Sequence, residues 1–362
     1  MKITINAGAL AAAIALTPKR KSKPLAHLVA DNGGIAIAVS DGNVTISAKL
    51  PADVAELGET CVAAEAFADL IGAFEPEAML ELQAGEIKNG LTITCDKRHY
   101  KLPMAAKPAE ELVILADVVG SVIAGSDMLQ LMEVLPAADD GKARDYLNSV
   151  CLHSDGAKLF GVSTNGTVLL RTMVAGSIGA ETVIPAASVV IMTKLLKTAK
   201  PATVKLRRTE RLLGMSAPTF AFVTRLISTP FPRYQVILPK ASSNAAGISR
   251  GDLARALRRL TAAATDCAAT PLIALAWNIG PSLGLYLARE PGNGADIIEA
   301  ATKSEAEIVV ALPALAGLVN EFSADRLHLE KTDTGALLIK AGDKLAVLSS
   351  CKWKTEVAAT AA

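Results

Sequence analysis

The stretch that decides the fold reads Asp145-Tyr146-Leu147-Asn148-Ser149-Val150-Cys151-Leu152-His153, then Ser154-Asp155-Gly156, then Lys158 to Arg171. Apolar residues at Leu147, Cys151 and Phe160 follow strand spacing, which predicts two strands joined by the Ser-Asp-Gly turn. Asn165-Gly166 then supplies the positive φ of a sharp reversal. The stretch predicts a β-hairpin whose second strand bends at Asn165-Gly166.

Length and composition restrict the class of protein only loosely. The chain has 362 residues, which predicts two or three domains. Its 37 basic and 36 acidic residues give a net charge of +1, so total charge excludes neither nucleic acid nor a small ligand. The five widely spaced cysteines match no zinc motif, and they predict free thiols in a reducing cytoplasm.

Two apolar stretches resemble targeting or membrane segments. The run at residues 9–16 is followed by Pro18-Lys19-Arg20-Lys21 where a signal peptide needs small residues, so secretion is not expected. Residues 267–288 are uncharged, but prolines and glycines interrupt them. We therefore expect a buried hairpin there and no membrane span.

Predicted helices recur along the chain with intervening strands. First helices begin near residues 7, 126 and 249, second helices near 64, 185 and 311, so the period is about 120 residues. Asn6, Ser126 and Ser249 are candidate N-caps. The pattern predicts an α+β fold of three repeated domains, each with two helices and antiparallel sheets, and each extending its sheet to a neighbour.

A second stretch, Phe231-Pro232-Arg233-Tyr234 to Leu238-Pro239-Lys240, completes a set of motifs. Together with Tyr146-Leu147-Asn148 and Thr164-Asn165-Gly166-Thr167-Val168-Leu169, it resembles the bacterial sliding clamp, the β subunit of DNA polymerase III. The resemblance implies clamp domains at 1–116, 117–242 and 243–354, and a tail at 355–362 that we expect to be disordered. It also implies a head-to-tail dimeric ring with helices lining the channel.

A sliding clamp requires an electropositive channel that attracts phosphates without reading bases. A solvated helix surface is the alternative explanation for any one basic residue. The DNA-facing candidates are Lys19, Arg20, Lys21, Lys23, Lys142, Arg144, Lys194, Lys197, Lys200, Arg250, Arg255, Arg258 and Arg259.

The resemblance also implies an apolar pocket that binds a short peptide from polymerases and other partners; interdomain core is the alternative. The sequence departs from the family's motifs at Thr167-Val168, at Gln235-Val236 and at the ending Ser349 to Trp353. The pocket candidates are Leu147, Thr164, Gly166, Thr167, Val168, Leu169, Pro232, Val236, Ile237 and Val347.

Ring closure would join the strand of Tyr100 and Leu102 to the third domain of a second copy near Asp296 and Ile298. An ordinary covered sheet edge is the alternative.

No catalytic, metal or cofactor site is expected. Cys151 and His153 share a strand face, but no Asp or Asn is placed to orient the histidine, so Cys151 is expected in the core. A phosphate-binding glycine loop is also missing from the sequence.

The expected function is therefore that of a cytoplasmic, non-catalytic clamp. It would encircle double-stranded DNA as a homodimer and tether DNA polymerase subunits after loading by a clamp loader. A divergent clamp paralogue that acts as an interaction module without a closed ring is the alternative, and a thiol-dependent hydrolase is a third possibility.

Overall fold

The structure is a computed structural model that describes residues 1–15, 24–85, 90–106, 120–141, 144–238, 245–264, 270–287 and 294–352. Contacts divide the chain into two compact units. Unit 1 comprises Met1–Leu129 and Ala187–Ser228, and unit 2 comprises Gln130–Ala186 and Thr229–Ala362. The predicted domain boundaries near residues 116 and 242 lie outside the described residues, so the three-domain limits stay a prediction.

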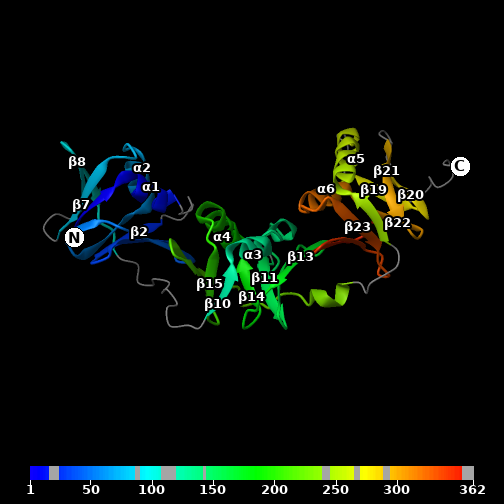
Figure 1. Cartoon of the computed structure of the whole chain (residues 1–362), viewed down its shortest axis with the longest axis horizontal. Helices are drawn as coiled ribbons and strands as arrows, with labels where there is room; N and C mark the ends of the chain where they lie inside the picture. Colours follow the sequence, from blue (N-terminus) through cyan, green and yellow to red (C-terminus); the bar gives the residue numbers. More distant parts are fainter. Residues whose placement is uncertain are drawn as a thin grey trace. The chain divides into compact units, whose positions relative to one another are not determined.

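Each helix of the described chain begins where a short strand ends (Figure 1). This arrangement confirms the predicted recurrence of helices. The helices are α1 (Ala7–Ala15), α2 (Ala64–Gly72), α3 (Gly125–Met132), α4 (Ala186–Ala199), α5 (Arg250–Ala263) and α6 (Leu312–Asn320). Among the described residues, every helix is too short or too polar to cross a bilayer.

Helix starts follow the predicted capping chemistry in two cases. Asn6 Oδ1 accepts a hydrogen bond from the Ala9 N–H at 2.9 Å, and Ser249 Oγ accepts one from the Asp252 N–H at 3.3 Å. The prediction that Ser126 caps the third helix is wrong, because α3 already begins at Gly125. A side chain at Gly125 would collide with the Pro201 carbonyl, so the helix start requires glycine for close packing.

Unit 1 contains two antiparallel sheets, with strand orders β5-β1-β7-β8-β9 and β10-β15-β16-β17-β4-β3-β2-β6. Its strands are β1 (Lys2–Asn6), β2 (Leu25–Asp31), β3 (Gly34–Ser40), β4 (Val44–Leu50), β5 (Asp53–Glu56), β6 (Gly58–Ala63), β7 (Met79–Ala84), β8 (Gly90–Cys95), β9 (Arg98–Pro103), β10 (Gly120–Ala124), β15 (Thr203–Arg208), β16 (Leu212–Ala217) and β17 (Phe220–Arg225).

The core of unit 1 forms where amphipathic helices cover these sheets. Phe67 and Ile71 of α2 are fully buried with Leu10 of α1, as their helical spacing predicts. Pairing of β17 with β4 joins strands from the first and middle predicted domains into one sheet. The expected extension of a sheet to its neighbour is confirmed there.

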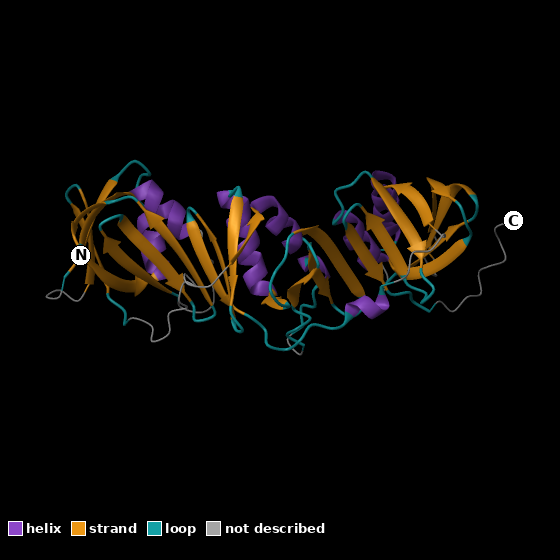
Figure 2. Ribbon diagram, turned by 60° about the horizontal axis from the view of Figure 1, so that its bottom comes forward, coloured by secondary structure: helices purple, strands orange, loops and turns teal. Residues whose placement is uncertain are grey.

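Unit 2 contains one twelve-stranded sheet, in the order β14-β11-β12-β13-β25-β24-β23-β18-β21-β20-β19-β22. In Figure 2 its strands are drawn in orange and the helices in purple. The strands are β11 (Ser149–Asp155), β12 (Lys158–Thr164), β13 (Val168–Ala175), β14 (Thr182–Pro185), β18 (Ala245–Ser249), β19 (Leu272–Trp277), β20 (Gly280–Leu287), β21 (Gly294–Thr302), β22 (Ala306–Ala311), β23 (Arg326–Lys331), β24 (Leu337–Ala341) and β25 (Lys344–Leu348).

The deciding stretch forms two hairpins rather than one bent hairpin. β11 starts at Ser149, four residues later than expected from the motif, because the Leu147 and Asn148 N–H groups bond to the Arg144 carbonyl in a turn. Strands β12 and β13 then reverse at Asn165-Gly166, where Gly166 has a φ of +93°. The reversal was predicted, but it is a complete turn between strands and not a bend within one.

Replacing Gly161 of β12 by Ala should destabilise the protein. A Cβ at Gly161 would lie 2.5 Å from the Leu131 carbonyl oxygen of α3, so helix and strand would have to separate. We expect the free energy of unfolding in urea to fall by about 1–3 kcal/mol. Gly179→Ala is the control, because nothing lies within 4 Å of that Cβ position. Equal stability of the two variants would contradict this packing.

Candidate functional site

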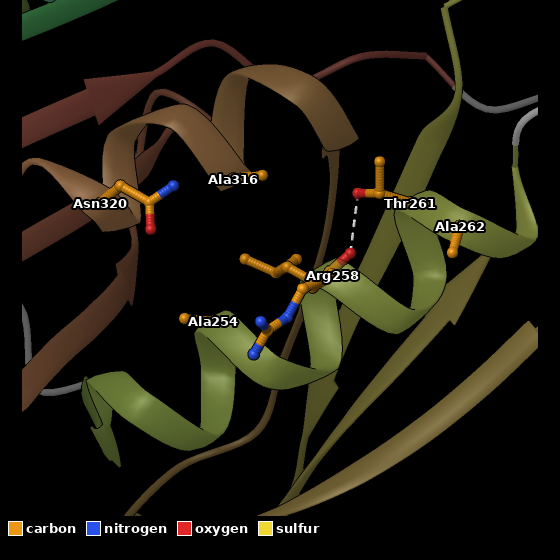
Figure 3. A pocket seen from close by; sticks show the side chains of 7 residues that line it. Ala254, Arg258, Thr261, Ala262, Ala316 and Asn320 are labelled. Carbon is orange, nitrogen blue, oxygen red and sulfur yellow. Dashed lines mark hydrogen bonds between the residues drawn. The ribbon is translucent and has the colours of Figure 1, made fainter.

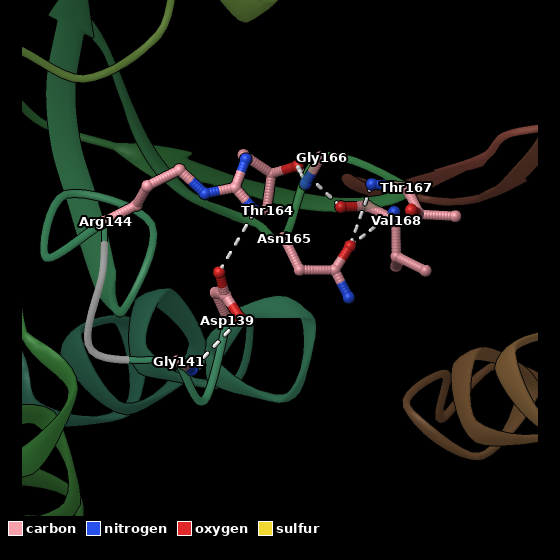
Figure 4. A network of polar contacts seen from close by, with 8 residues as sticks. All are labelled: Asp139, Gly141, Arg144, Thr164, Asn165, Gly166, Thr167 and Val168. Atoms are coloured by element: carbon pink, nitrogen blue, oxygen red, sulfur yellow. Dashed lines mark hydrogen bonds and ion pairs between the residues drawn. The ribbon is translucent and has the colours of Figure 1, made fainter.

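The β12–β13 turn is held by its own side chains (Figure 4). Asn165 Oδ1 accepts hydrogen bonds from the N–H groups of Thr167 and Val168 at 2.9 and 2.8 Å. Thr164 Oγ1 donates to the Val168 carbonyl at 2.6 Å and accepts from the Gly166 N–H at 3.1 Å. Four bonds within five residues fix the turn as a rigid edge.

Three predicted pocket residues share one row of the sheet. Thr164 of β12 is the cross-strand partner of Leu169 on β13, which in turn is the partner of Val347 on β25. The chain after β25 continues past the turn, since the Ser349 N–H donates to the Thr167 carbonyl at 2.9 Å. The three side chains of the row are buried, so their positions are fixed by the sheet, and we call this row the floor of the candidate site.

Arg144 lies beside this turn, although it was predicted to face DNA. It forms an ion pair with Asp139 at 3.3 Å, and Figure 4 shows its side chain extending towards the strand end that carries Thr164. Leu147 is also buried. Its backbone carbonyl accepts a hydrogen bond from the Asp139 N–H, which holds it near the Arg144 ion pair.

The segment before residue 238 forms the short helix η2 (Tyr234–Ile237) and exposes two aliphatic side chains. Val236 is 79% exposed and Ile237 is 49% exposed. Phe231 and Tyr234 are buried and anchor the segment, and the Phe231 N–H donates to Glu181 Oε1 at 3.0 Å. Apolar side chains therefore face solvent from a fixed backbone, which is the arrangement of a binding surface.

A buried aromatic cluster connects η2 to the strands. Tyr234 Oη lies 2.6 Å from His153 Nε2, and the His153 ring stacks on Phe160 at 5.2 Å between centroids. The Arg171 guanidinium lies over the Phe160 ring, 5.0 Å from the ring centroid. Burial raises the pKa of Tyr234 to about 12 and holds the pKa of His153 below its usual range. A neutral imidazole with its proton on Nδ1 accepts this hydrogen bond from the tyrosine hydroxyl.

The predicted DNA-facing residues fall into three groups. Lys19, Arg20, Lys21, Lys23 and Lys142 lie outside the described residues. Lys194, Lys197 and Lys200 are exposed on and after α4. On α5, Arg255 is paired with Asp252 and Arg259 with Asp296, the latter at 2.6 Å.

Arg258 differs from these two neighbours. Among the described residues it has no ion-pair partner, and it lines a cavity of about 640 Å³ between α5 and α6 (Figure 3). The other cavity residues are Ala254, Leu257, Thr261, Ala262, Ala316 and Asn320, so Arg258 is its one charged group.

The predicted dimer residues lie on two strands with unpaired edges. Within the described chain, β9 pairs only with β8, and Gly294 to Glu299 of β21 pair only with β20. Tyr100 is 39% exposed and packs edge-on against Phe74. Ile298 is buried in its own unit and the Asp296 carboxylate pairs with Arg259, so a role of these two residues in a dimer stays a prediction.

Several solved structures of bacterial clamps share this architecture. The DNA polymerase III β subunit of Pseudomonas aeruginosa matches with a TM-score of 0.86 at 18% identity, covering 98% of this chain and 100% of that one. The sliding clamp of Caulobacter crescentus matches at 0.85 and 18%, with the same coverage. The Bartonella birtlesii clamp, solved with griselimycin, matches at 0.85 and 19%, again over 98% and 100%. The fold is that of the bacterial β sliding clamp.

Sequence comparison agrees with this assignment. The β sliding clamp of Pseudomonas aeruginosa is 23% identical over 215 residues, a match that spans 57% of each chain. No protein-family model matches. The chain thus has the fold of β sliding clamps, three domains of antiparallel sheets and helices, and it is similar in sequence to one of them over 57% of its length.

Clamp proteins are non-catalytic, and the one candidate nucleophile here is unsuited to catalysis. Cys151 is fully buried, and burial raises the pKa of its thiol so that the reactive thiolate is disfavoured. Among the described residues, no group of three or more His, Cys, Asp or Glu side chains is placed to hold a metal ion.

Sequence reasoning missed the cluster that holds η2. His153 was considered only as a partner of Cys151, and Arg171 and Glu181 were not considered. The available signal was the aromatic pair Phe231 and Tyr234 beside a proline, which predicts an anchored segment.

Tyr234→Phe should destabilise the clamp fold locally and globally. The change removes the hydroxyl bonded to His153 and leaves the partly buried ring nitrogen without that donor. We expect the free energy of unfolding to fall by about 1–3 kcal/mol, measured by urea denaturation. Tyr100→Phe is the matched control, because that tyrosine is 39% exposed and should tolerate the change. Hydrogen exchange at η2 should rise only in Tyr234→Phe, and unchanged exchange there would contradict the anchoring.

Stability should also decrease on mild acidification because of His153. Its folded pKa lies below the unfolded value, so the folded state binds fewer protons. The stabilising contribution is complete above the unfolded pKa of about 6.5 and is lost as pH falls from there through the lower folded pKa. The loss of unfolding free energy from neutral to mildly acidic pH should be smaller in His153→Gln than in the unmodified chain. The exposed His99→Gln serves as control, and identical pH profiles for both variants would refute the assignment.

Proposed function

We propose that this protein is a cytoplasmic sliding clamp that closes as a head-to-tail homodimer around double-stranded DNA and tethers DNA polymerase subunits. The observation that carries the proposal is the structural match to two solved clamps, which covers 98% of this chain and the full length of each clamp chain. A fold of this kind has no activity of its own to perform. Retention by encirclement is the function that it can provide.

Ring closure is supported by complementary strand edges. β9 carries Arg98, His99 and Lys101, whereas the unpaired part of β21 carries Asp296 and Glu299. Addition of β9 from one copy to β21 of another would satisfy the free backbone groups of both edges. Each copy has one edge of each kind, so the contact is head-to-tail and two copies can close a ring.

Tyr100 and Leu102 would lie on the helix side of this junction. Tyr100 pairs with buried Ile93 and Leu102 with buried Leu91, so both point towards their own core side. Asp296 and Ile298 also point towards the helix side of β21, where Asp296 meets Arg259. The four predicted residues would thus meet on one face of the joined sheet.

DNA contact would depend on the exposed cations of the helices. Lys194 and Lys197 of α4 and Arg258 of α5 are candidates in the described chain. Such contacts attract phosphates regardless of sequence, and they weaken as salt increases. Few contacts suffice in a ring, since topology prevents escape.

The floor at Thr164, Leu169 and Val347 and the exposed Val236 and Ile237 together form the proposed partner groove. An apolar peptide side chain buried there would contribute about 1.5–3 kcal/mol. Polymerase subunits and the clamp loader are the partners expected to present such a peptide. Arg144 is reassigned from the DNA channel to this groove.

An interaction module without a closed ring is the second candidate. The ion pair between Arg259 and Asp296 favours it, because that carboxylate is already engaged within the chain and would contribute less to a junction.

Light scattering of the full chain at micromolar and then nanomolar concentration tests ring closure. We expect about twice the chain mass of 37.5 kDa. Tyr100→Glu should yield monomers, because it places a carboxylate in the junction beside Asp296. Tyr286→Glu is the matched control, as Tyr286 is also 39% exposed but lies on β20, one strand in from the unpaired edge.

Encirclement itself is tested on DNA. After loading by a clamp loader and ATP, the dimer should stay on nicked circular DNA during gel filtration and dissociate once that DNA is linearised. A monomer at every concentration, or equal retention on both forms, would overturn the clamp proposal and leave the interaction module.

A further inference from the structure

Unit 2 exposes an apolar patch on the sheet face that points away from the helices, and the proposed groove does not use it. Ile279 is 79% exposed, Tyr286 is 39% exposed and Ile297 is 69% exposed. All three line one cavity of about 220 Å³ around the β19–β20 turn. Asp296 and Ile298 face the helix side of β21, so Ile297 between them faces away from the helices. We call these three residues the outer patch.

Gly284 lets the outer patch lie flat on the sheet. It is the cross-strand partner of Ile297 on β21. A Cβ at this position would lie 2.5 Å from Tyr286 Oη and 2.6 Å from Tyr286 Cε2, so the tyrosine ring lies over the glycine. The ring therefore covers the sheet next to Ile297 and widens the apolar surface.

Acidic residues border the outer patch. Glu307 of β22 is the cross-strand partner of Ala276, which pairs with Gly284. Glu299 and Glu305 are also exposed, and none of the three carboxylates has an ion-pair partner among the described residues. Lys303 is the basic side chain in the intervening turn. An occupant of this surface should therefore combine apolar and basic side chains.

The chain itself supplies a segment of that chemistry where the described residues end. The Cys351 N–H donates to the Val309 carbonyl at 2.8 Å, which places Cys351 at the outer edge of β22. Exposed Lys352 follows, and the sequence continues with Trp353 and Lys354. Residues 353–362 lie outside the described residues.

The distance from this point to the outer patch is short. Cys351 lies beside Val309, which pairs with Ala274, which pairs with Tyr286, so three strand spacings separate Cys351 from Tyr286. Three strand spacings amount to about 14 Å, and each extended residue spans about 3.3 Å. The Trp353 side chain can therefore reach Tyr286, and later residues can reach Ile297.

We infer that residues 353–362 dock on the outer patch of their own chain, with Trp353 against Tyr286 and Ile297 and with Lys352 and Lys354 beside the acidic border. The inference does not depend on the proposed clamp function. It assigns an occupant to a surface that would otherwise leave three large apolar side chains in water.

Tryptophan fluorescence tests the inference in the full chain. The difference between the unmodified protein and Trp353→Phe isolates the Trp353 signal from that of Trp277. We expect Trp353 emission at shorter wavelength than a solvent-exposed tryptophan and protection from acrylamide quenching. Ile297→Glu should abolish both, whereas Leu57→Glu, a similar change at an aliphatic side chain of unit 1 that is 58% exposed, should preserve both.

One further variant and two further outcomes distinguish docking of the chain's own C-terminal residues from docking of a second copy or of a separate protein. Gly284→Ala, which displaces the Tyr286 ring without adding charge, should reduce the protection if Ile297→Glu fails to fold. A blue shift that disappears on dilution to nanomolar concentration would mean docking on a second copy and would overturn the inference. A fully exposed Trp353 in the unmodified protein would also overturn it, leaving the outer patch to a separate protein.

Discussion

Backbone hydrogen bonding between β13 and β25 is the interaction on which the candidate site depends. A strand edge exposes N–H and C=O groups that must find partners, and a small two-helix domain cannot pair all of them alone. Pairing of Leu169 with Val347 closes two such edges at a defined register. Strands almost two hundred residues apart in the chain thus become neighbours, and their side chains form one row.

The two parts of the proposed groove, its floor at Thr164, Leu169 and Val347 and its wall at η2, are stabilised by different forces. The floor is part of a continuous ladder that also includes the Ser349 bond to Thr167, so it cannot shift without breaking several backbone bonds. The wall at η2 is held mainly by buried Phe231 and Tyr234 and by the bond to His153. Exposed positions on η2, such as Val236, can therefore change while the scaffold remains intact. Divergence from the clamp motifs at Gln235-Val236 is compatible with an unchanged fold for this reason.

Local chemistry made part of this structure predictable from sequence. Asn6, Ser249 and Asn165-Gly166 act on backbone groups within three residues, so their effects could be deduced from spacing alone. The row of Thr164, Leu169 and Val347 was available only through family resemblance, because no periodicity links residues on β13 and β25. The ion pairs of Arg144 and Arg259 could not be predicted for a related reason: their partners are set by a turn and by a neighbouring strand, which a search for basic clusters does not detect.

The distribution of charge favours retention by topology over retention by affinity. Two of the three clustered arginines on α5 are neutralised by Asp252 and Asp296, which leaves Arg258 as the one without an ion pair in the described chain. The net charge of +1 provides no general attraction to phosphate either. A protein that held DNA from one side would depend on many phosphate contacts, and with about six to ten of them its affinity would fall steeply as salt increases. Such contacts would also slow its movement, because each step would break them. A ring needs only enough positive charge to keep the duplex away from its walls, so a weakly basic chain with this fold fits encirclement better than side-on binding.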